Sequence, residues 1–213
     1  NQESLDQAIL LLRESLQKFN SGLLEYNLGN MLYLKQDYPQ ALLHYYRAEK
    51  WIPQDQKLRL NMAYARKRLG IKEPDSIPLD FIFFWKDSFA FPLARMLFIA
   101  GWNLLWMLSV FLLVFPSIRK KILLRTSFFV FAAIFTYYGI GFAYNYYQKH
   151  CLKWAVVQKE NAELFRDPST SYPENKIAGT GEKVRLESEL GNWAQIRFQG
   201  KKLWILKKNI EMI

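Results

Sequence analysis

The sequence contains very few residues suited to metal or redox chemistry. Among its 213 residues it has one cysteine, Cys151, and two histidines, His44 and His150. A single cysteine excludes an intrachain disulfide and a metal site built from several cysteines. His44 has no carboxylate or nucleophile at an evident partner spacing, and the adjacent side chains of His150 and Cys151 diverge on a helix. We therefore predict no catalytic residue, no metal site, no cofactor and no enzymatic activity.

Acidic residues are scarce in the middle of the chain. Residues 76–153 contain 8 basic and 2 acidic side chains, whereas residues 1–75 and 154–213 each have a net charge of only +2. The excess positive charge therefore lies in the most apolar third. This distribution indicates membrane topology rather than a nucleic-acid footprint, and we expect no nucleic-acid partner.

Two stretches of the middle region lack charge altogether. Residues 96–115 form an uncharged run of 20 residues, and residues 126–148 form one of 23. At about 1.5 Å per residue, helices of these lengths match a hydrocarbon layer roughly 30 Å thick. We predict transmembrane helices at 93–115 and 126–148, in contact with membrane lipid. Two buried helices of a soluble domain are disfavoured, because two such lengths in tandem exceed what a small core needs.

The predicted connection between these helices, residues 116–125, is basic. Its cationic residues are Arg119, Lys120, Lys121 and Arg125. Short basic loops remain in the cytoplasm, so both ends of the apolar region are predicted to face outward. The aromatic segment 76–92 before the first span is predicted to be an interfacial amphipathic helix, or else an extension of that span. The start at Asn1 fits either a cleaved signal peptide or a trimmed sequence, and this choice stays open.

The N-terminal third has a period of 34 residues. Asn27-Leu28-Gly29 recurs as Asn61-Met62-Ala63, and the surrounding pattern resembles a tetratricopeptide repeat over residues 22–55. Glu25 departs from this pattern, which has a small or aromatic residue there. The residues that carry the resemblance are Leu28, Gly29, Leu32, Ala41, Tyr45, Ala48 and Pro53. The resemblance implies paired helices within an all-α region, residues 1–75.

Local signals mark where these helices begin and end. Asp37 is a predicted N-cap, Pro53 ends the helix that follows it, and Ser4 with Gln7 forms a capping box. A closing helix is predicted from 56 to 69. About two repeats are visible, fewer than the roughly three that a self-sufficient solenoid needs. We expect the membrane, a partner or residues before Asn1 to cover the remaining surface.

In such solenoids the first helix of each pair lines a concave groove that holds an extended peptide. Helical spacing predicts that six residues face this groove: Tyr26, Asn30, Tyr33, Lys57, Tyr64 and Lys67. Asparagine amides can bond a peptide backbone, and the two lysines can meet a carboxylate. The alternative is that the helices act only as a spacer.

The pattern changes to strand periodicity after Trp154. Residues 183–188, 193–198 and 203–205 are predicted strands separated by glycine turns. This region, residues 154–213, resembles bacterial SH3-type domains, which implies a small all-β barrel. The matching residues are Gly191, Trp193, Ile196, Gly200 and Trp204. Leu203 stands where these domains usually have glycine.

The order of these parts describes a multidomain membrane protein with tetratricopeptide-like helices, a transmembrane hairpin and an SH3-like barrel. This order resembles the BatE-type proteins of bacterial aerotolerance operons. The resemblance implies a two-pass inner-membrane protein with both soluble domains in the periplasm. It also implies that the protein acts together with von Willebrand factor A-domain membrane proteins and a MoxR-type ATPase. We interpret the chain as a non-enzymatic scaffold with two protein-interaction domains; the alternative is a cell-wall sensor whose SH3-like domain binds peptidoglycan.

Overall fold

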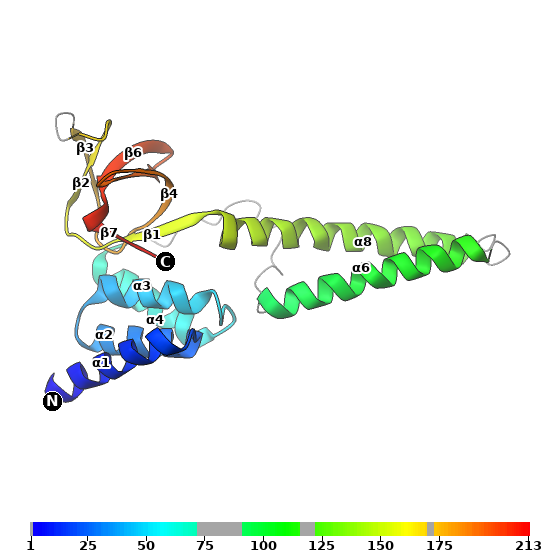
Figure 1. The fold of residues 1–213 in the computed structure, drawn as a ribbon, viewed down its shortest axis with the longest axis horizontal. Coiled ribbons are helices and arrows are strands. Elements are labelled where there is room, and N and C mark those ends of the chain that lie inside the picture. The colour runs from blue at the N-terminus through cyan, green and yellow to red at the C-terminus, as the bar shows by residue number, and fades with distance from the viewer. Residues whose placement is uncertain (1, 72–90, 116–121, 170–172) are drawn as a thin grey trace. The chain divides into compact units, whose positions relative to one another are not determined.

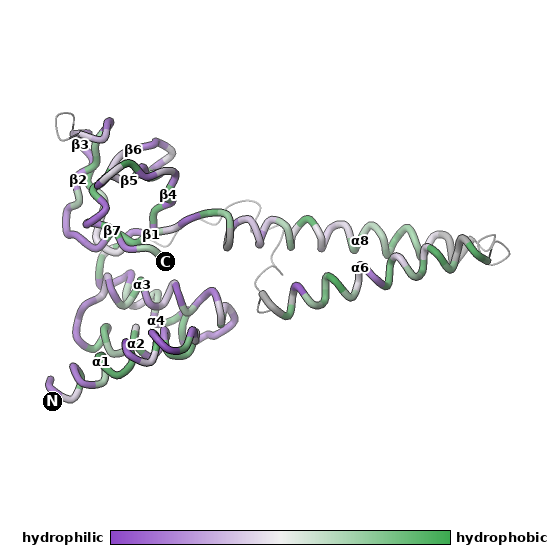
Figure 2. The backbone as a smooth tube through the Cα atoms, viewed as in Figure 1, coloured by the Kyte–Doolittle hydropathy of each residue, from purple (hydrophilic) through white to green (hydrophobic). Residues whose placement is uncertain are grey.

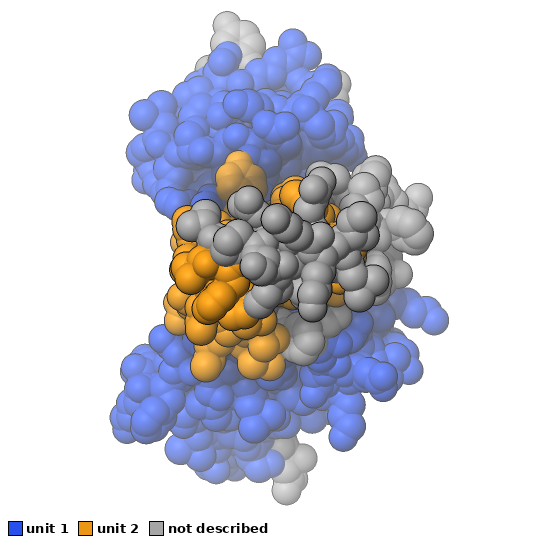
Figure 3. Space-filling view, turned by 90° about the vertical axis from the view of Figure 1, so that its right-hand side faces the viewer, with its two compact units in different colours: residues 1–76, 150–213 blue, residues 77–149 orange. Residues whose placement is uncertain are grey.

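The computed structural model describes residues 2–71, 91–115, 122–169 and 173–213 (Figure 1). The chain divides into two compact units (Figure 3). The first unit combines residues 1–76 with residues 150–213, and the second comprises residues 77–149. Segments far apart in the sequence therefore fold together, while the apolar region between them forms a unit of its own.

Four helices open the first unit. They are α1 (Gln2–Lys18), α2 (Gly22–Leu34), α3 (Tyr38–Glu49) and α4 (Gln56–Leu69). The predicted caps explain their limits, because the Asp37 carboxylate accepts a hydrogen bond from the Gln40 amide and Gly70 ends α4 with a φ of 67°. The capping box predicted at Ser4 is wrong, since Ser4 already lies inside α1.

Helix α3 is buried around most of its circumference. Its buried residues are Ala41, Leu42, Leu43, His44, Tyr45, Tyr46 and Ala48. A surface helix buries one stripe, so burial on this scale requires neighbours on more than one side. Helices α2 and α4 cover one side, where the small Gly29 admits the ring of Tyr45. Strand β1 (Lys153–Val157) of the C-terminal sheet contacts the helix as well.

The C-terminal segment folds into an antiparallel sheet. Its strands are β1 (Lys153–Val157), β2 (Ala162–Phe165), β3 (Pro173–Ala178), β4 (Lys183–Leu190), β5 (Trp193–Phe198), β6 (Lys201–Leu206) and β7 (Ile210–Met212). The order across the sheet is β3-β2-β6-β5-β4-β1-β7. The three strands predicted from alternation are confirmed, and Gly191 and Gly200 occupy their turns with φ of 55° and 78°. The seven described strands form an open order with β3 and β7 at the two ends.

Polar side chains of α3 bind the strand at one end of this sheet. The Gln40 amide donates to the Glu211 carboxylate at 2.9 Å. Arg47 donates to the same carboxylate at 3.3 Å and to the Met212 carbonyl at 2.6 Å. Lys50 donates to the Ile213 carbonyl at 3.1 Å, and its burial, with Arg47 nearby, lowers the pKa of Lys50. These bonds satisfy edge carbonyls that would otherwise attract another strand.

Apolar and cation–π contacts also hold the helices against the sheet. Together with the hydrogen bonds described above they form the helix–sheet joint. Val156 of β1 is fully buried within the helical core. Gly181, in the turn before β4, lies so close to α4 that an added Cβ atom would stand 2.9 Å from Ile71 Cδ1 and nearer still to Leu69. The Lys183 ammonium lies 4.6 Å from the ring centre of Tyr46. The sheet therefore covers part of the surface that the four helices leave open.

The second unit is a helical hairpin of α6 (Phe91–Val114) and α8 (Ile122–Tyr146). Phe98 stacks on Phe135 and Phe142 with ring centres 5.2 and 5.0 Å apart. Trp102, one turn later in α6, meets Phe135 at 6.2 Å but not the later Phe142, as expected for antiparallel helices. Gly101 lies against Phe135, and Gly139 against Phe98. Glycines at the contact therefore receive aromatic rings from the opposite helix.

Figure 2 shows hydrophobic residues along much of both hairpin helices. Within the described residues one helix, Thr126–Tyr146, is long and apolar enough to cross a bilayer, and Arg95–Phe111 is a shorter apolar stretch. Residues 122–125, predicted as loop, already belong to α8. Three predicted topology residues, Arg119, Lys120 and Lys121, lie outside the described residues, as does most of the predicted interfacial segment, and the side chain of Arg125 is not described.

Candidate functional site

A pocket of about 220 Å³ opens between α2, α3 and α4. Its lining residues are Asn30, Tyr33, Leu34, Tyr45, Asn61 and Tyr64. Three come from α2, two from α4 and one from α3, so the helix pair and the helix after it build the site together. None of the lining side chains is charged, and the walls combine two amides, three phenols and one aliphatic group.

A hydrogen-bond network fixes the floor of this pocket. The Asn30 carbonyl oxygen accepts from the Tyr45 hydroxyl at 2.9 Å and from the Asn61 amide at 2.8 Å. The Asn61 amide also donates to the Tyr26 hydroxyl at 3.1 Å. Within the described part of the chain, the Asn30 Nδ2 donor and the Asn61 Oδ1 acceptor have no hydrogen-bond partner. Both groups belong to residues that line the pocket, so one donor and one acceptor remain available to a ligand.

Burial determines the protonation of the central phenol. Tyr45 is 1% exposed, and this burial raises its pKa. The neighbouring Tyr26 raises the pKa of Tyr45 further, whereas the hydrogen bond with Asn61 lowers it. The hydroxyl is accordingly neutral at physiological pH and remains a donor to Asn30. Because that bond occupies the Asn30 oxygen, the Asn30 amide nitrogen is directed to other partners.

The structure brings together only part of the predicted groove. Asn30, Tyr33 and Tyr64, three of the predicted groove residues, line the pocket. Tyr26 instead supports Asn61. Lys57 and Lys67 are exposed on α4 and do not line the pocket, and their predicted role in meeting a ligand carboxylate stays a prediction.

Sequence reasoning missed Asn61, Tyr45 and Leu34. Asn61 had a signal, since it follows Asn27 by one period and lies between Lys57 and Tyr64 on one helical face. Tyr45 was assigned only to packing. Its ring does pack on Gly29, while its hydroxyl reaches the pocket. One residue thus serves both the core and the site.

A largely buried polar pair joins α2 and α3. Glu25 of α2 and His44 of α3 meet at 2.6 Å, with side chains 17% and 8% exposed. This contact explains the departure of Glu25 from the repeat pattern, because its carboxylate is matched by the histidine of the facing helix. Each group satisfies the other inside the bundle.

The sheet carries a second candidate surface, an aromatic cluster of Phe165, Trp193 and Trp204. Phe165 and Trp193 meet edge to face with ring centres 5.1 Å apart. Trp204 pairs with Phe165 across β2 and β6. Both tryptophans are half-buried, whereas Ile196 of the SH3-like signature is fully buried in the sheet's own core. The cluster therefore leaves aromatic surface accessible.

The described residues contain no group of three or more His, Cys, Asp or Glu side chains placed to hold a metal ion. Cys151 is exposed and unpaired in the π-helical turn Tyr147–Cys151 that follows α8. The side chain of His150 is outside the described set.

Comparison with models of protein families finds no match to this chain, and comparison with curated proteins finds none either.

Proposed function

We propose that this protein is a membrane-anchored, non-enzymatic scaffold whose helical pocket holds an extended segment of a partner protein. The observation that carries this proposal is the neutral pocket with its unpartnered amide donor and acceptor, Asn30 Nδ2 and Asn61 Oδ1. A peptide backbone offers the complementary acceptor and donor at each residue. The exposed rims of Tyr64 and Leu34 add apolar surface for a ligand side chain.

Two membrane crossings are part of the proposal. The first unit contains residues from before and after the apolar hairpin, joined by Gln40, Arg47 and Val156. Segments that pack together lie on the same side of a membrane. The chain between them must therefore cross an even number of times, which supports α6 as a second span beside α8. The basic residues Arg119, Lys120, Lys121 and Arg125 between the spans favour a cytoplasmic connection and a periplasmic first unit.

The sequence resemblance supplies candidate partners. Tetratricopeptide-like helices followed by an apolar hairpin and an SH3-like domain resemble BatE-type proteins of aerotolerance operons. On that resemblance the scaffold belongs to the bacterial inner membrane, and its partners are von Willebrand factor A-domain membrane proteins and a MoxR-type ATPase system. The helical pair α2–α3, flanked by α1 and α4, and the C-terminal antiparallel sheet are compatible with this proposal.

Partner capture tests the pocket. We expect Asn30→Ala to weaken binding of a purified von Willebrand factor A-domain partner by roughly fivefold to a hundredfold, since one buried hydrogen bond is worth about 1–3 kcal/mol. Asn20→Ala, an exposed asparagine between α1 and α2, is the matched control. Equal binding by the two variants would show that the pocket does not hold the partner.

Cysteine labelling tests the topology. In a Cys151→Ser background, an impermeant maleimide applied from the periplasmic side should label Gln17→Cys and Lys208→Cys, both exposed in the first unit. It should not label Ser117→Cys, in the basic connection. Labelling of only one of the first two sites would contradict an even number of crossings.

The aromatic cluster favours a second candidate function. Half-buried tryptophan rings suit contact with sugar or peptide groups of the cell wall, so peptidoglycan is the alternative ligand. Binding of the full chain to isolated sacculi, lost in Trp204→Ala but kept in Asn30→Ala, would favour a cell-wall sensor over the scaffold.

A further inference from the structure

The charge of the helical segment is concentrated in α4. This helix has five basic residues and no acidic one, QKLRLNMAYARKRL, whereas α1, α2 and α3 contain acidic residues in similar or greater number than basic ones. Its apolar face of Leu58, Met62 and Ala65 is buried in the bundle. Arg66 turns inward and donates to the Tyr46 hydroxyl at 3.3 Å, whereas Arg59 and Lys67 are exposed away from the buried face.

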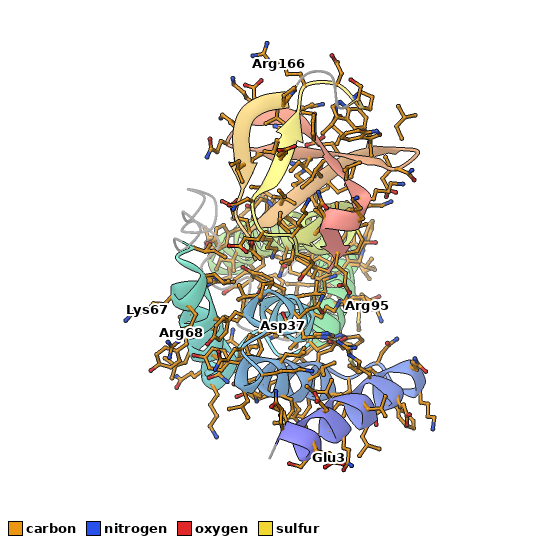
Figure 4. All side chains as sticks on the ribbon, turned by 90° about the vertical axis from the view of Figure 1, so that its left-hand side faces the viewer. Glu3, Asp37, Lys67, Arg68, Arg95 and Arg166 are labelled. Carbon is orange, nitrogen blue, oxygen red and sulfur yellow. The ribbon has the colours of Figure 1, made fainter. Side chains whose placement is uncertain are left out.

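The exposed side of this helix has a defined set of residues, which we call the outer face of α4: Arg59, Leu60, Ala63 and Lys67. Positions 59, 63 and 67 are four apart, so they follow one another along the helix surface. Figure 4 shows the Lys67 side chain pointing away from the bundle. Leu60 is 52% exposed between these cations. The outer face thus combines positive charge with exposed apolar surface.

The pocket lies on a neighbouring side of the same helix. Asn61 and Tyr64 turn toward α2, where they line the cavity, whereas none of the four outer-face residues does so. A ligand in the pocket and a surface against the outer face therefore occupy different parts of α4.

No acidic side chain of the described chain neutralises the outer face. Arg59 donates only to the carbonyl of Gln54, at 3.3 Å, and Lys67 forms no ion pair within the described residues. Nearby Arg68 is also exposed, and a hydrogen bond with Tyr33 raises its pKa. Elsewhere in the unit basic residues meet carboxylates, as Lys35 meets Asp6 at 2.6 Å. The outer face therefore retains uncompensated charge.

We infer that the outer face of α4 binds the anionic head groups of a phospholipid bilayer. The inference rests on the membrane attachment proposed above, which brings a bilayer within reach, since 19 residues separate Ile71 from α6 at Phe91. A basic helix face with exposed leucine matches the pattern of helices that lie on anionic membranes, where lipid phosphates neutralise the cations and the apolar side chain enters the head-group layer.

A fluorescence experiment on the full chain tests this inference. In a Cys151→Ser background, Ala63→Cys is labelled with an environment-sensitive dye and reconstituted into nanodiscs whose lipids carry a head-group quencher. We expect strong quenching with phosphatidylglycerol present, weak quenching in phosphatidylcholine alone, and relief by added salt, because surface charge is screened over about 10 Å at 0.1 M salt.

Charge reversal supplies the matched variants. Arg59→Glu/Lys67→Glu should lower the equilibrium constant for lipid contact, obtained from the lipid-dependent quenching, by about fivefold for each residue changed. Arg13→Glu/Lys18→Glu makes the same charge change at two exposed positions of α1 and should leave it unaltered. Both pairs are exposed, so circular dichroism should report the same helix content.

The outcomes separate the inference from the proposals on which it rests. Equal quenching in the two lipids, or no effect of Arg59→Glu/Lys67→Glu, would overturn lipid binding. A dye that responds to soluble polyglutamate but not to phosphatidylglycerol would identify an acidic protein partner and also overturn it. Failure of the chain to enter nanodiscs at all would instead contradict the membrane attachment.

Discussion

The helical and sheet segments of the first unit use their polar groups differently. In the sheet, carboxylates are shared among several bases: Glu174 meets Arg166 and Lys201, Glu187 meets Arg185, Arg197 and Lys202, and Glu189 meets Lys207. In the helical segment, the outer-face cations Arg59 and Lys67 meet no carboxylate within the described chain. The pocket amides Asn30 and Asn61 each use only one of their two polar atoms in hydrogen bonds there. Polar groups already paired stabilise a fold, whereas unpaired ones remain available for binding. This difference supports the proposal that the helices carry recognition, and it indicates that the ion pairs of the sheet serve its own fold.

Gly181→Val tests whether the sheet supports the helices. Its added side chain would collide with Leu69 and Ile71, and its φ of 83° disfavours any residue with a Cβ atom. We expect the free energy of unfolding to fall by about 2–4 kcal/mol, from overpacking and backbone strain together. Circular dichroism of the helices and tryptophan fluorescence should both report the loss in denaturant titrations.

Gly200→Val is the control for the joint. Gly200 has a similar φ of 78°, but an added Cβ atom there meets nothing within 4 Å. It should cost only the backbone strain, about 1–2 kcal/mol. If both valine variants lost the same stability, the contact at Gly181 would contribute nothing to the joint.

His44→Ala tests a polar group that the helical segment has already paired. Removing the imidazole leaves the Glu25 carboxylate buried without its partner, at a cost of about 1–3 kcal/mol. Replacing both residues, as in Glu25→Leu/His44→Ala, should cost less than the two single changes added together. A double-mutant cycle from denaturant unfolding measures this coupling, and simple additivity would show that the pair is not coupled.

Acid titration tests the paired carboxylates of the sheet, and we expect its effect on stability to be smaller than that of the substitutions above. The Arg197 hydrogen bond, aided by the charges of Arg185 and Lys202, holds the pKa of Glu187 below its usual 4.5. Such a carboxylate stabilises the fold fully above the unfolded pKa, and this contribution is lost as the pH falls through the lowered folded value. The urea midpoint should therefore drop on acidification below about pH 4.5. Glu187→Gln should flatten this dependence, whereas Glu160→Gln, an exposed control, should leave it unchanged.

Local sequence signals predicted most of the secondary structure. Periodicity and caps located α2, α3 and α4, and alternation located β4, β5 and β6, because both depend on neighbours a few residues apart. The start of α1 was predicted wrongly. The Ser4-to-Gln7 spacing fits a capping box, but such a motif also fits within a helix.

The candidate site was only half predictable. Asn30, Tyr33 and Tyr64 followed from helical spacing alone. Tyr45 could not be assigned, since its role depends on Gly29 allowing the ring to lie where its hydroxyl meets Asn30. The pairing of Glu25 with His44 could not be predicted either, because nothing in their separation of 19 residues shows that the two side chains face each other.

The sequence by itself determined the elements of this protein: the 34-residue helical period, the two uncharged runs and the alternating strands, each a pattern in which residues respond to their immediate neighbours. Only the tertiary structure decided that residues 2–71 and 153–213 share one unit. The contacts responsible, Gln40 and Arg47 with Glu211 and Gly181 against Ile71, join positions more than a hundred residues apart. Burial and hydrogen bonding between such distant groups depend on how whole elements pack, and no local pattern encodes that arrangement.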